Sequence, residues 1–281
     1  MFFLKLSVDP VSADAPELVK RAVQERWQFY TLRNGLSSFP ERLAQKLKEA
    51  GVRVLTEHPC SHVTFSSNGA KVVTDGSESK SFHADHIVSA VRSDVLASVL
   101  GREHADLASM LCSIPFVDVG VVNVQYQNDV MPSQFKEGFG YLIPSHVRSK
   151  VLGVVFDSSV FPSLGGSHKS GTRLTVMLGG HLFTQLLGDA DKIDTAVVTT
   201  AALETLQDHL GIKDKPIECF TSIHRKCIPQ YTIGHSERAA NIAAYLTINN
   251  LPLTALGSSY NGASVTDCVF NSYNAMSQFV H

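Results

Sequence analysis

The segment that most constrains the fold lies at the end of the chain. Residues 251–257 are apolar and predict a buried strand, and residues 258–267 predict a glycine-containing loop that runs into a helix. Such a unit offers free backbone N–H groups and the positive end of the helix dipole to an anion. Such a unit usually lies at the start of a nucleotide-binding domain, but here it lies at the end of one. No G-x-G-x-x-G motif precedes it. The pattern predicts the back half of a nucleotide-binding protein.

Composition narrows the class of protein. The chain has 281 residues, of which 44% are hydrophobic and 18% charged, and this balance is typical of a globular protein. The net charge is −2 and the basic residues are scattered, which argues against a nucleic-acid partner. Five cysteines without a C-x-x-C pair indicate reduced thiols. Asparagine, proline and glycine interrupt the uncharged stretch at 239–266, so no membrane span is predicted. The apolar start at 1–5 is too short for a signal peptide, and no targeting segment is predicted.

Hydrophobic periodicity predicts alternating helices and strands in the first part of the chain. Helices are expected at 14–27, from Ser37 or Ser38 as the N-cap to a C′ glycine at Gly51, and in a short stretch from Asp94. Asn68-Gly69 predicts a hairpin between strands 63–66 and 71–74. Further strands are expected at 29–32, 52–56 and 84–90.

The middle of the chain has a different pattern. Apolar strands at 116–125, 139–143, 151–157 and 174–178 are joined by Gly/Ser/Pro loops, which favours an antiparallel sheet. A helix at 189–210, a strand at 217–223, and a final helix, strand and helix at 239–246, 251–257 and 267–279 follow. We predict one discontinuous nucleotide-binding domain, 29–110 and 226–281, with a sheet domain at 111–225 inserted and a helical segment at 1–28.

Two other site types are weaker interpretations. His58 with His62 and His83 with His86 have spacings that metal sites use, but residues i and i+3 of a strand face opposite sides and no third ligand is nearby, so we predict no metal site. Residues 257–262 approach the G-x-S-x-G of serine hydrolases, but Asn261 stands where the second glycine belongs. A purely structural strand–loop–helix unit remains an alternative to a ligand site.

Several stretches together carry a resemblance to one family. They are Trp-Gln-Phe-Tyr-Thr-Leu-Arg-Asn-Gly at 27–35, Phe-Pro at 39–40, Ala-Asp-His-Ile-Val-Ser-Ala at 84–90, Cys-Ile-Pro-Gln-Tyr-Thr-Ile-Gly-His at 227–235, Gly-Ser-Ser-Tyr-Asn-Gly at 257–262 and Asp-Cys at 267–268. From about Pro16 to its end, the chain resembles the protoporphyrinogen oxidases of the flavin amine oxidase-like superfamily. The Cys-Ile-Pro-Gln-Tyr stretch is the most specific of these motifs, and the Arg-x-Gly and Asp-x-(Ile/Val) stretches are shared more widely among flavin oxidases.

The resemblance implies a fold class: α/β (α+β overall), with a partial FAD-binding, doubly wound (Rossmann-like) domain and an inserted antiparallel-sheet substrate domain. It also implies site residues. By position in the family motifs, Cys60, which follows Pro59, contacts the FAD adenine. Ser258, Ala263, Ser264 and Val265 contact the flavin and pyrophosphate. Leu142 and Met177 correspond to apolar residues of the porphyrin pocket, although taken alone both fit ordinary sheet core. We nominate no catalytic acid or base.

The resemblance further implies oxidation of protoporphyrinogen IX to protoporphyrin IX, with FAD as hydride acceptor, O2 as oxidant and hydrogen peroxide as by-product. It implies a mitochondrial inner-membrane enzyme on the intermembrane-space face, a homodimer, and peripheral membrane association through a region upstream of this chain. We therefore expect this chain to be incomplete. Two alternatives stay open. One is another flavin oxidase of the amine oxidase type, and the other is a non-enzymatic truncated isoform that acts as a binding or dimerisation module.

Overall fold

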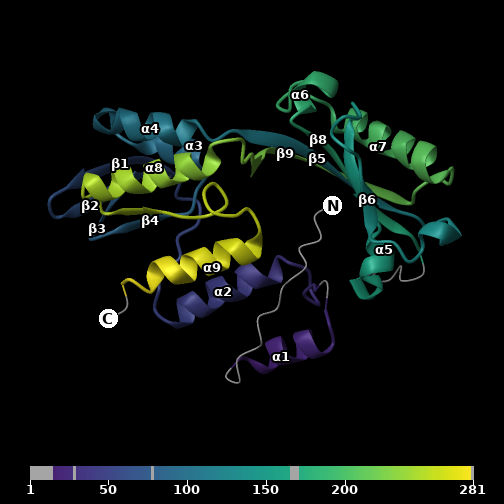
Figure 1. The fold of residues 1–281 in the computed structure, drawn as a ribbon, viewed down its shortest axis with the longest axis horizontal. Helices are drawn as coiled ribbons and strands as arrows, with labels where there is room; N and C mark the ends of the chain where they lie inside the picture. Colours follow the sequence, from purple (N-terminus) through teal and green to yellow (C-terminus); the bar gives the residue numbers. More distant parts are fainter. Residues whose placement is uncertain (1–14, 28–29, 77–78, 165–170, 280–281) are drawn as a thin grey trace. The chain divides into compact units, whose positions relative to one another are not determined.

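A computed structural model describes residues 15–27, 30–76, 79–164 and 171–279 of the protein (Figure 1). The chain divides into two compact units. The first comprises Met1–Val54, Gly120–Leu178 and Lys192–Ser222, and the second comprises Leu55–Val119, Gly179–Asp191 and Ile223–His281. The predicted domain boundaries stay a prediction.

The second unit contains the strand that precedes the C-terminal loop. β10 (Leu253–Ala255) pairs in parallel with β4 (Ile87–Ser89), and Thr254 lies opposite Val88. Parallel strands need a long crossover between them, so this pair joins segments far apart in the sequence. The parallel pair confirms the α/β part of the predicted fold, although the structure has only these two strands in the sheet within the residues that it describes.

A separate antiparallel sheet follows the predicted hairpin. β1 (Cys60–Ser66) pairs with β2 (Gly69–Thr74), which pairs with β3 (Lys80–Ala84). Gly69 has φ +117°, and a Cβ atom there would lie 2.4 Å from the Ala84 carbonyl oxygen, so only glycine fits this turn. The Asn68-Gly69 prediction is confirmed.

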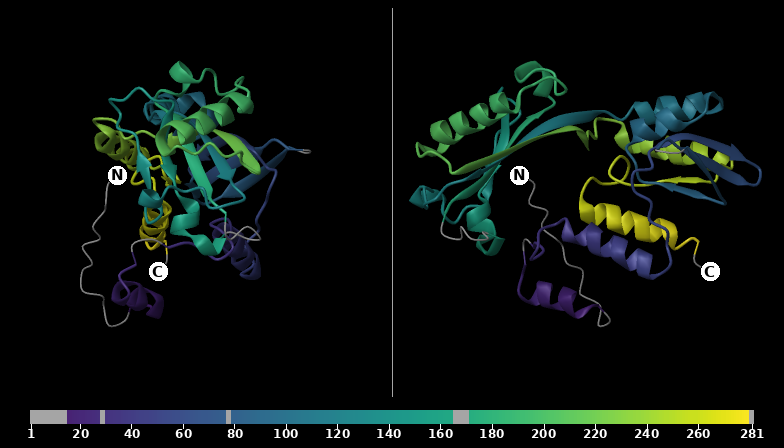
Figure 2. Two further views of the ribbon diagram at one scale, coloured as in Figure 1. Left: turned by 90° about the vertical axis from the view of Figure 1, so that its right-hand side faces the viewer. Right: turned by 180° about the vertical axis from the view of Figure 1, so that it is seen from behind.

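Three helices complete the core of the second unit: α3 (Ser93–Val99), α4 (Ala105–Cys112) and α8 (His235–Ile248). α4 packs against α8, α3 contacts β1, and α8 contacts β10. The ribbons of α4 and α8 lie side by side in Figure 1 and in the view from behind in Figure 2. A short 3-10 turn, Arg102–His104, precedes α4. Their buried side chains form one apolar cluster with the neighbouring strands: Val63, Leu96, Ala97, Val99, Leu107, Leu111, Ile114, Ala239, Ile242, Leu246, Leu253 and Tyr260.

A five-stranded sheet forms most of the first unit, in the order β6-β7-β8-β5-β9. The strands are β5 (Phe116–Gln125), β6 (Gly140–Leu142), β7 (Val151–Val155), β8 (Arg173–Gly180) and β9 (Glu218–Pro229), and β5, β8 and β9 continue into the second unit. β6, β7 and β8 pair antiparallel, which confirms the predicted sheet type.

One face of this sheet is covered by α7 (Thr195–Leu210), which packs against β7. Val154 and Val176 from the sheet and Val198 and Leu206 from the helix are almost fully buried. The Asp194 carboxylate caps the helix by accepting a hydrogen bond from the Ala196 backbone N–H at 2.9 Å, and Gly211 ends it with φ +71°. Short turns α5 (Asp157–Val160), α6 (Phe183–Leu186), η2 (Ser133–Phe135) and η3 (Pro162–Leu164) connect the strands.

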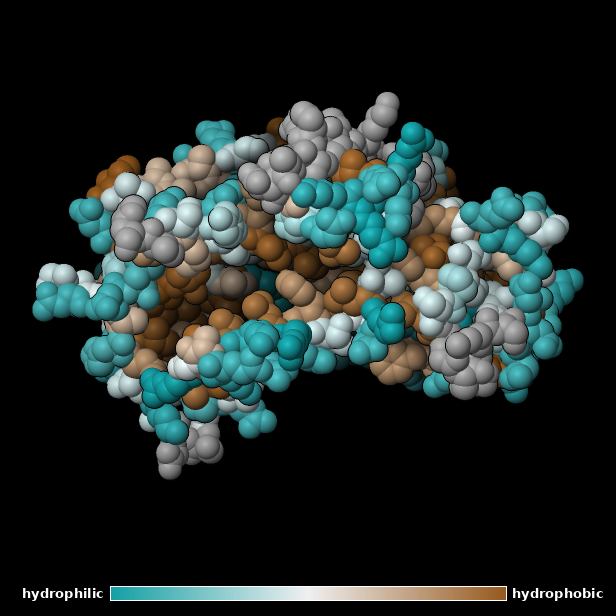
Figure 3. All heavy atoms as spheres, turned by 90° about the horizontal axis from the view of Figure 1, so that it is seen from below, coloured by the Kyte–Doolittle hydropathy of each residue, from teal (hydrophilic) through white to brown (hydrophobic). Residues whose placement is uncertain are grey.

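Among the described helices of eight or more residues, three bury none of their residues: α1 (Glu17–Gln24), α2 (Ser38–Glu49) and α9 (Val265–Met276). These helices carry large, exposed apolar side chains, including Leu43 on α2 and Phe270 on α9, which is 63% exposed. Figure 3 shows hydrophobic residues, in brown, at the surface of the protein as seen from below. No helix of the described ranges combines the length and the apolar composition needed to cross a bilayer.

Some predicted elements are wrong. Residues 30–32 and 52–56 form no strand, and residues 28–29 lie outside the described residues. The Val52 amide donates instead to the Leu47 carbonyl at 2.9 Å, beside Gly51 with φ +83°, and so closes α2. Neither serine caps that helix through its side chain, because the Ser38 hydroxyl donates to the Gly35 carbonyl.

Other elements have shifted bounds. The segment predicted as a strand at 84–90 breaks after Ala84, since β3 and β4 belong to different sheets. The helix predicted at 189–210 starts only at Thr195, where Asp194 supplies its cap. The strand predicted at 217–223 extends to Pro229, because β5 offers a long edge beside it.

Candidate functional site

The loop between β10 and α9 holds three of the predicted cofactor residues, Ser258, Ala263 and Ser264, and Val265 is the first residue of α9. The loop turns at Gly257, with φ +96°, and at Gly262, with φ +121°. A Cβ atom on Gly262 would lie 2.5 Å from the Asp267 Cβ, and one on Gly257 would lie 3.3 Å from the Ala90 carbonyl oxygen. Both the backbone angles and the close approach of neighbours therefore require glycine.

The start of α9 is capped by the protein itself. The Ser264 hydroxyl accepts a hydrogen bond from the Asp267 backbone N–H at 3.0 Å. The Asp267 carboxylate accepts from the Ser264 backbone N–H at 3.2 Å and from its hydroxyl at 2.6 Å. This is a capping box. A carboxylate thus occupies part of the helix N-terminus where the sequence predicts an external anion. The side chains of Ala263, Ser264 and Val265 are exposed.

Two side chains from the Cys227–His235 stretch hold the loop. The Tyr231 hydroxyl donates to the Ser258 carbonyl at 2.6 Å and accepts from the Gly262 backbone N–H at 2.9 Å. His235 Nε2 lies 2.7 Å from the Tyr260 carbonyl oxygen. The two rings stack with their centroids 3.8 Å apart and an interplanar angle of 11°. Burial, partly opposed by the hydrogen bond from Gly262, raises the pKa of Tyr231, so its hydroxyl stays protonated and can donate.

Sequence reasoning missed the role of these two residues. It used the stretch only for its resemblance, and no local pattern pairs Tyr231 or His235 with a loop so much later in the chain. His235 is 7% exposed, and a buried imidazole needs a hydrogen-bond partner. The one signal in the sequence for such a hydrogen bond was a histidine within a largely uncharged stretch.

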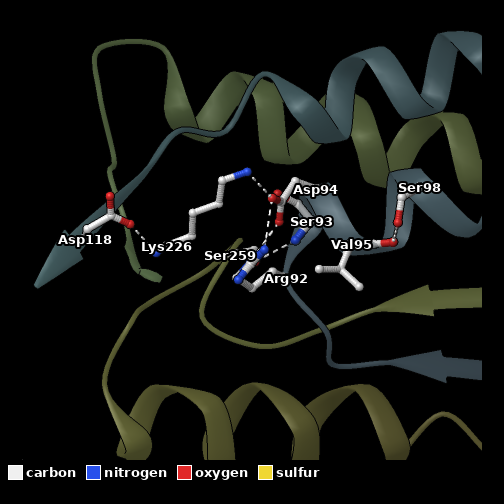
Figure 4. Close-up of polar contacts among 8 residues, drawn as sticks. All are labelled: Arg92, Ser93, Asp94, Val95, Ser98, Asp118, Lys226 and Ser259. Carbon is white, nitrogen blue, oxygen red and sulfur yellow. Dashed lines mark hydrogen bonds and ion pairs between the residues drawn. The ribbon is translucent and has the colours of Figure 1, made fainter. Parts of the chain in front are cut away.

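A hydrogen bond to the first residue of α3 also fixes the same loop (Figure 4). The buried Ser259 hydroxyl accepts a hydrogen bond from the Ser93 backbone N–H at 3.2 Å. Next to it, Asp94 accepts two hydrogen bonds from the Arg92 guanidinium and one from Lys226 Nζ at 3.0 Å. Burial opposes ionisation of Asp94, but the Arg92 and Lys226 contacts outweigh it and keep the pKa of Asp94 below its usual value. The charges beside Ser259 are therefore paired inside the unit.

Lys226 itself is held in an unusual backbone conformation. Its φ is +44°, and its backbone N–H donates to the Asp118 carboxylate at 2.7 Å (Figure 4). A non-glycine residue with positive φ needs such support. This bend in β9 lies just before Tyr231 in sequence.

Cys60 lies at the start of β1, in the three-stranded sheet and not in the β4–β10 pair. Its side chain is exposed, and its thiol points to the His62 carbonyl at 3.8 Å. Burial is the main cause that raises the pKa of Cys60, so the thiol stays protonated at neutral pH. The structure places Cys60 in the same unit as the 258–265 residues.

The two predicted substrate residues meet on one face of the five-stranded sheet. Leu142 lies opposite Gly153 on β7, and Gly153 lies opposite Met177 on β8. Residues in direct register share a face of a sheet. Leu142 is 53% exposed and Met177 is half-buried, so neither is ordinary core. With only glycine between them, these side chains form an open apolar strip, which we call the Leu142–Met177 strip.

The same sheet face continues into a cavity of about 370 Å³ that the sequence did not predict. Arg173 and Thr175 alternate with Met177 along β8 and so share its face. Thr175 donates to the Asp157 carboxylate at 2.7 Å, and Arg173 donates to the Phe161 carbonyl at 3.2 Å. Burial raises the pKa of Asp157 despite its bond to Thr175 and the nearby Arg173 charge. Among the residues that the structure describes, no group of three His, Cys, Asp or Glu side chains could hold a metal ion.

The family model described as "Flavin containing amine oxidoreductase" matches residues 3–275. Human protoporphyrinogen oxidase is 39% identical over 252 residues, which are 90% of this chain and 52% of that protein. The protoporphyrinogen oxidase of Schizosaccharomyces pombe is 34% identical over 57% of this chain and 32% of its own length. The chain thus spans about half the length of the human relative that it matches, and less of the yeast one.

Solved structures share the fold. A putative protoporphyrinogen oxidase from Exiguobacterium has a TM-score of 0.72 at 20% identity, over 92% of this chain and 54% of that chain. Reduced UDP-galactopyranose mutase has a TM-score of 0.65 at 12% identity, over 87% of this chain and 53% of that chain. Together with the family match, they confirm the fold class predicted from the sequence: the chain belongs to the flavin containing amine oxidoreductases.

Proposed function

We propose that the protein is an FAD-dependent oxidase that converts protoporphyrinogen IX to protoporphyrin IX in haem synthesis. The observation that carries this proposal is the 39% identity to human protoporphyrinogen oxidase over 90% of the chain. A match to enzymes over so much of the sequence favours an oxidase over a non-enzymatic binding module.

The cofactor fits the loop between β10 and α9. Ser258, Ala263, Ser264 and Val265 would hold the flavin and pyrophosphate, and the Cys60 backbone would contact the adenine. Exposure of 263–265 and the glycine-only turn at Gly262 support this assignment. The carboxylate of Asp267 occupies part of the helix start, so the pyrophosphate would rely on neighbouring backbone groups. When bound, the flavin accepts hydride from the substrate and reduces O2 to hydrogen peroxide.

The substrate fits the Leu142–Met177 strip. A tetrapyrrole is broad and largely apolar over its faces, and pockets for such ligands are lined mainly by apolar side chains. The exposed leucine and the half-buried methionine offer such a wall without a charge of their own. These residues bind and orient the substrate and exclude water, and we assign no residue a proton transfer.

The relatives also support a cellular setting. We propose a mitochondrial enzyme of the inner membrane, on its intermembrane-space face, that associates with the membrane peripherally and forms a homodimer. The support is the resemblance to mammalian protoporphyrinogen oxidases.

The test compares the purified 281-residue chain with the longest gene product that contains it. Flavin is measured by its absorbance, and turnover by porphyrin fluorescence together with hydrogen peroxide release. We expect porphyrinogen oxidation in at least the longer product, while putrescine and other amines are not oxidised.

Each outcome decides between candidates. Oxidation of amines in place of porphyrinogen would favour another flavin oxidase of the amine oxidase type. A folded protein without flavin and without turnover in both preparations would overturn the proposal.

A further inference from the structure

Tyr231 and His235 lie where β9 gives way to α8. Tyr231 follows the end of β9 at Pro229, and His235 is the first residue of α8, after Gly234 with φ +83°. The tyrosine ring is 43% exposed, whereas the imidazole is 7% exposed. Their close stack makes one rigid unit, because the buried imidazole fixes the plane against which the phenol ring lies.

This pair contacts three residues of the loop after β10. A single oxygen atom, that of the Tyr231 hydroxyl, bonds to the Ser258 carbonyl and to the Gly262 backbone N–H. His235 Nε2 bonds to the Tyr260 carbonyl between them. Since a carbonyl only accepts, Nε2 carries the hydrogen in this contact. Two side chains thus satisfy three backbone groups of one loop.

The loop needs such support. Gly257 and Gly262 have access to many backbone conformations, so the segment between them loses more freedom on folding than an ordinary loop. A loop that is already fixed binds its ligand more tightly, because the ordering cost does not fall on the binding step. The Tyr231 hydroxyl contacts Ser258, which is assigned to the cofactor, and Gly262, which precedes the assigned Ala263. The His235 contact fixes Tyr260 between them.

We propose that Tyr231 and His235 are positioning residues that hold the 258–262 backbone in the conformation that binds the flavin cofactor. This inference rests on the proposed function. The inference goes beyond the proposed function, because neither Tyr231 nor His235 is among the residues assigned to the cofactor or to the substrate.

The decisive variant is Tyr231→Phe, which keeps the stacked ring and removes the hydroxyl. The matched control is Tyr245→Phe on α8, whose hydroxyl makes no hydrogen bond within the described residues. In the cofactor-free protein, we expect hydrogen exchange of the Gly262 amide to become about tenfold faster in Tyr231→Phe only. In the longest gene product that binds flavin, we expect Tyr231→Phe to raise the dissociation constant for FAD about tenfold.

A conservative pair tests the histidine. His235→Gln retains a donor for the Tyr260 carbonyl and should bind FAD better than His235→Leu, which has none. Faster exchange of Gly262 with unchanged FAD affinity in Tyr231→Phe would show a merely structural role and overturn the inference. Unchanged exchange would overturn it as well.

The two failures are distinguishable. If the unaltered protein binds FAD and Tyr231→Phe binds it equally well, the inference fails and the proposed function stands. If the unaltered protein binds no FAD in any preparation, the proposed function fails and the positioning role for that cofactor fails with it.

Discussion

The loop between β10 and α9 and the Leu142–Met177 strip are ordered by two different kinds of interaction. In the loop, the backbone groups of Ser258, Tyr260 and Gly262 are held by directional hydrogen bonds with Tyr231 and His235. On the strip, the two side chains are aligned by strand register across a glycine.

This difference implies different tolerances. A directional polar contact is lost when one atom is removed or displaced, because its geometry is narrow. An apolar wall accepts a change of shape at nearly constant volume but not a charge. Polar positioning suits a ligand whose polar groups must be fixed in place, and an apolar strip suits a broad, mostly apolar ligand.

The largest expected effect is that of Gly262→Val in the loop. Valine resists φ +121°, and its Cβ would collide with Asp267 and disturb the capping box. We expect a loss of about 3 kcal/mol of unfolding free energy, measured by denaturant titration, together with loss of flavin binding.

Gly188→Val is the matched control, because Gly188 has φ +101° but no atom lies within 4 Å of the place that a Cβ would take. It should carry the backbone strain alone and leave flavin binding intact. An equal loss of flavin in both variants would show that the loop is no more constrained than an ordinary turn.

Next in size is the effect of a charge on the strip. Met177→Asp should lower porphyrinogen turnover about a hundredfold with little change in flavin content, because a carboxylate against an apolar ring is poorly solvated. Met177→Leu conserves volume and should stay within a few-fold of the unaltered protein. If flavin and turnover fall together in Met177→Asp, Met177 belongs to the core and not to a binding wall.

The two regions also differ in how far the sequence predicts them. The turn at Asn68-Gly69 and the strand at 116–125 follow from local patterns, and the structure confirms both. The pairing of Leu142 with Met177 through Gly153 depends on register between three strands, which no local pattern encodes.

The same limit explains the misses. Residues 52–56 have strand-like composition, but the Val52 amide closes α2 and no neighbouring strand pairs with the segment within the described residues. The contacts of Tyr231 with Ser258 and Gly262 join distant parts of the chain, so only the fold brings them together.

A smaller effect is expected for Gly153→Ala, which fills the gap in the strip. The added Cβ would lie 2.5 Å from the Tyr141 carbonyl oxygen and 2.7 Å from Leu142 Cδ2. We expect about 1–2 kcal/mol of destabilisation, measured by thermal unfolding. Leu142→Ala in the same background should recover part of it by removing one of the two collisions. No recovery would place the whole cost on the β6 backbone.

The smallest effect is expected beside the strip, at Asp157. Burial raises the pKa of Asp157 in the folded protein. The folded state therefore holds this proton more tightly than the unfolded state. The resulting stabilisation is fully present below the unfolded pKa, about 4, and is lost as the pH rises through the folded value. At neutral pH the ionised carboxylate costs stability. Asp157→Asn, whose amide oxygen can still accept from Thr175, should raise the unfolding free energy by less than about 1 kcal/mol.

This gain should shrink as the pH falls towards about 4, where the carboxyl group of the unaltered protein becomes neutral. Asp129 supplies the opposite case. Its hydrogen bond with Lys136 is the main cause that lowers its pKa, so the stability it contributes is present above the unfolded pKa and is lost as the pH falls through the folded value. Asp129→Asn should therefore be neutral or slightly destabilising at neutral pH, because the pair is exposed. Thermal unfolding of both variants across this pH range measures the contrast. A gain for Asp157→Asn that does not change with pH would mean that Asp157 affects stability through packing and not through its charge.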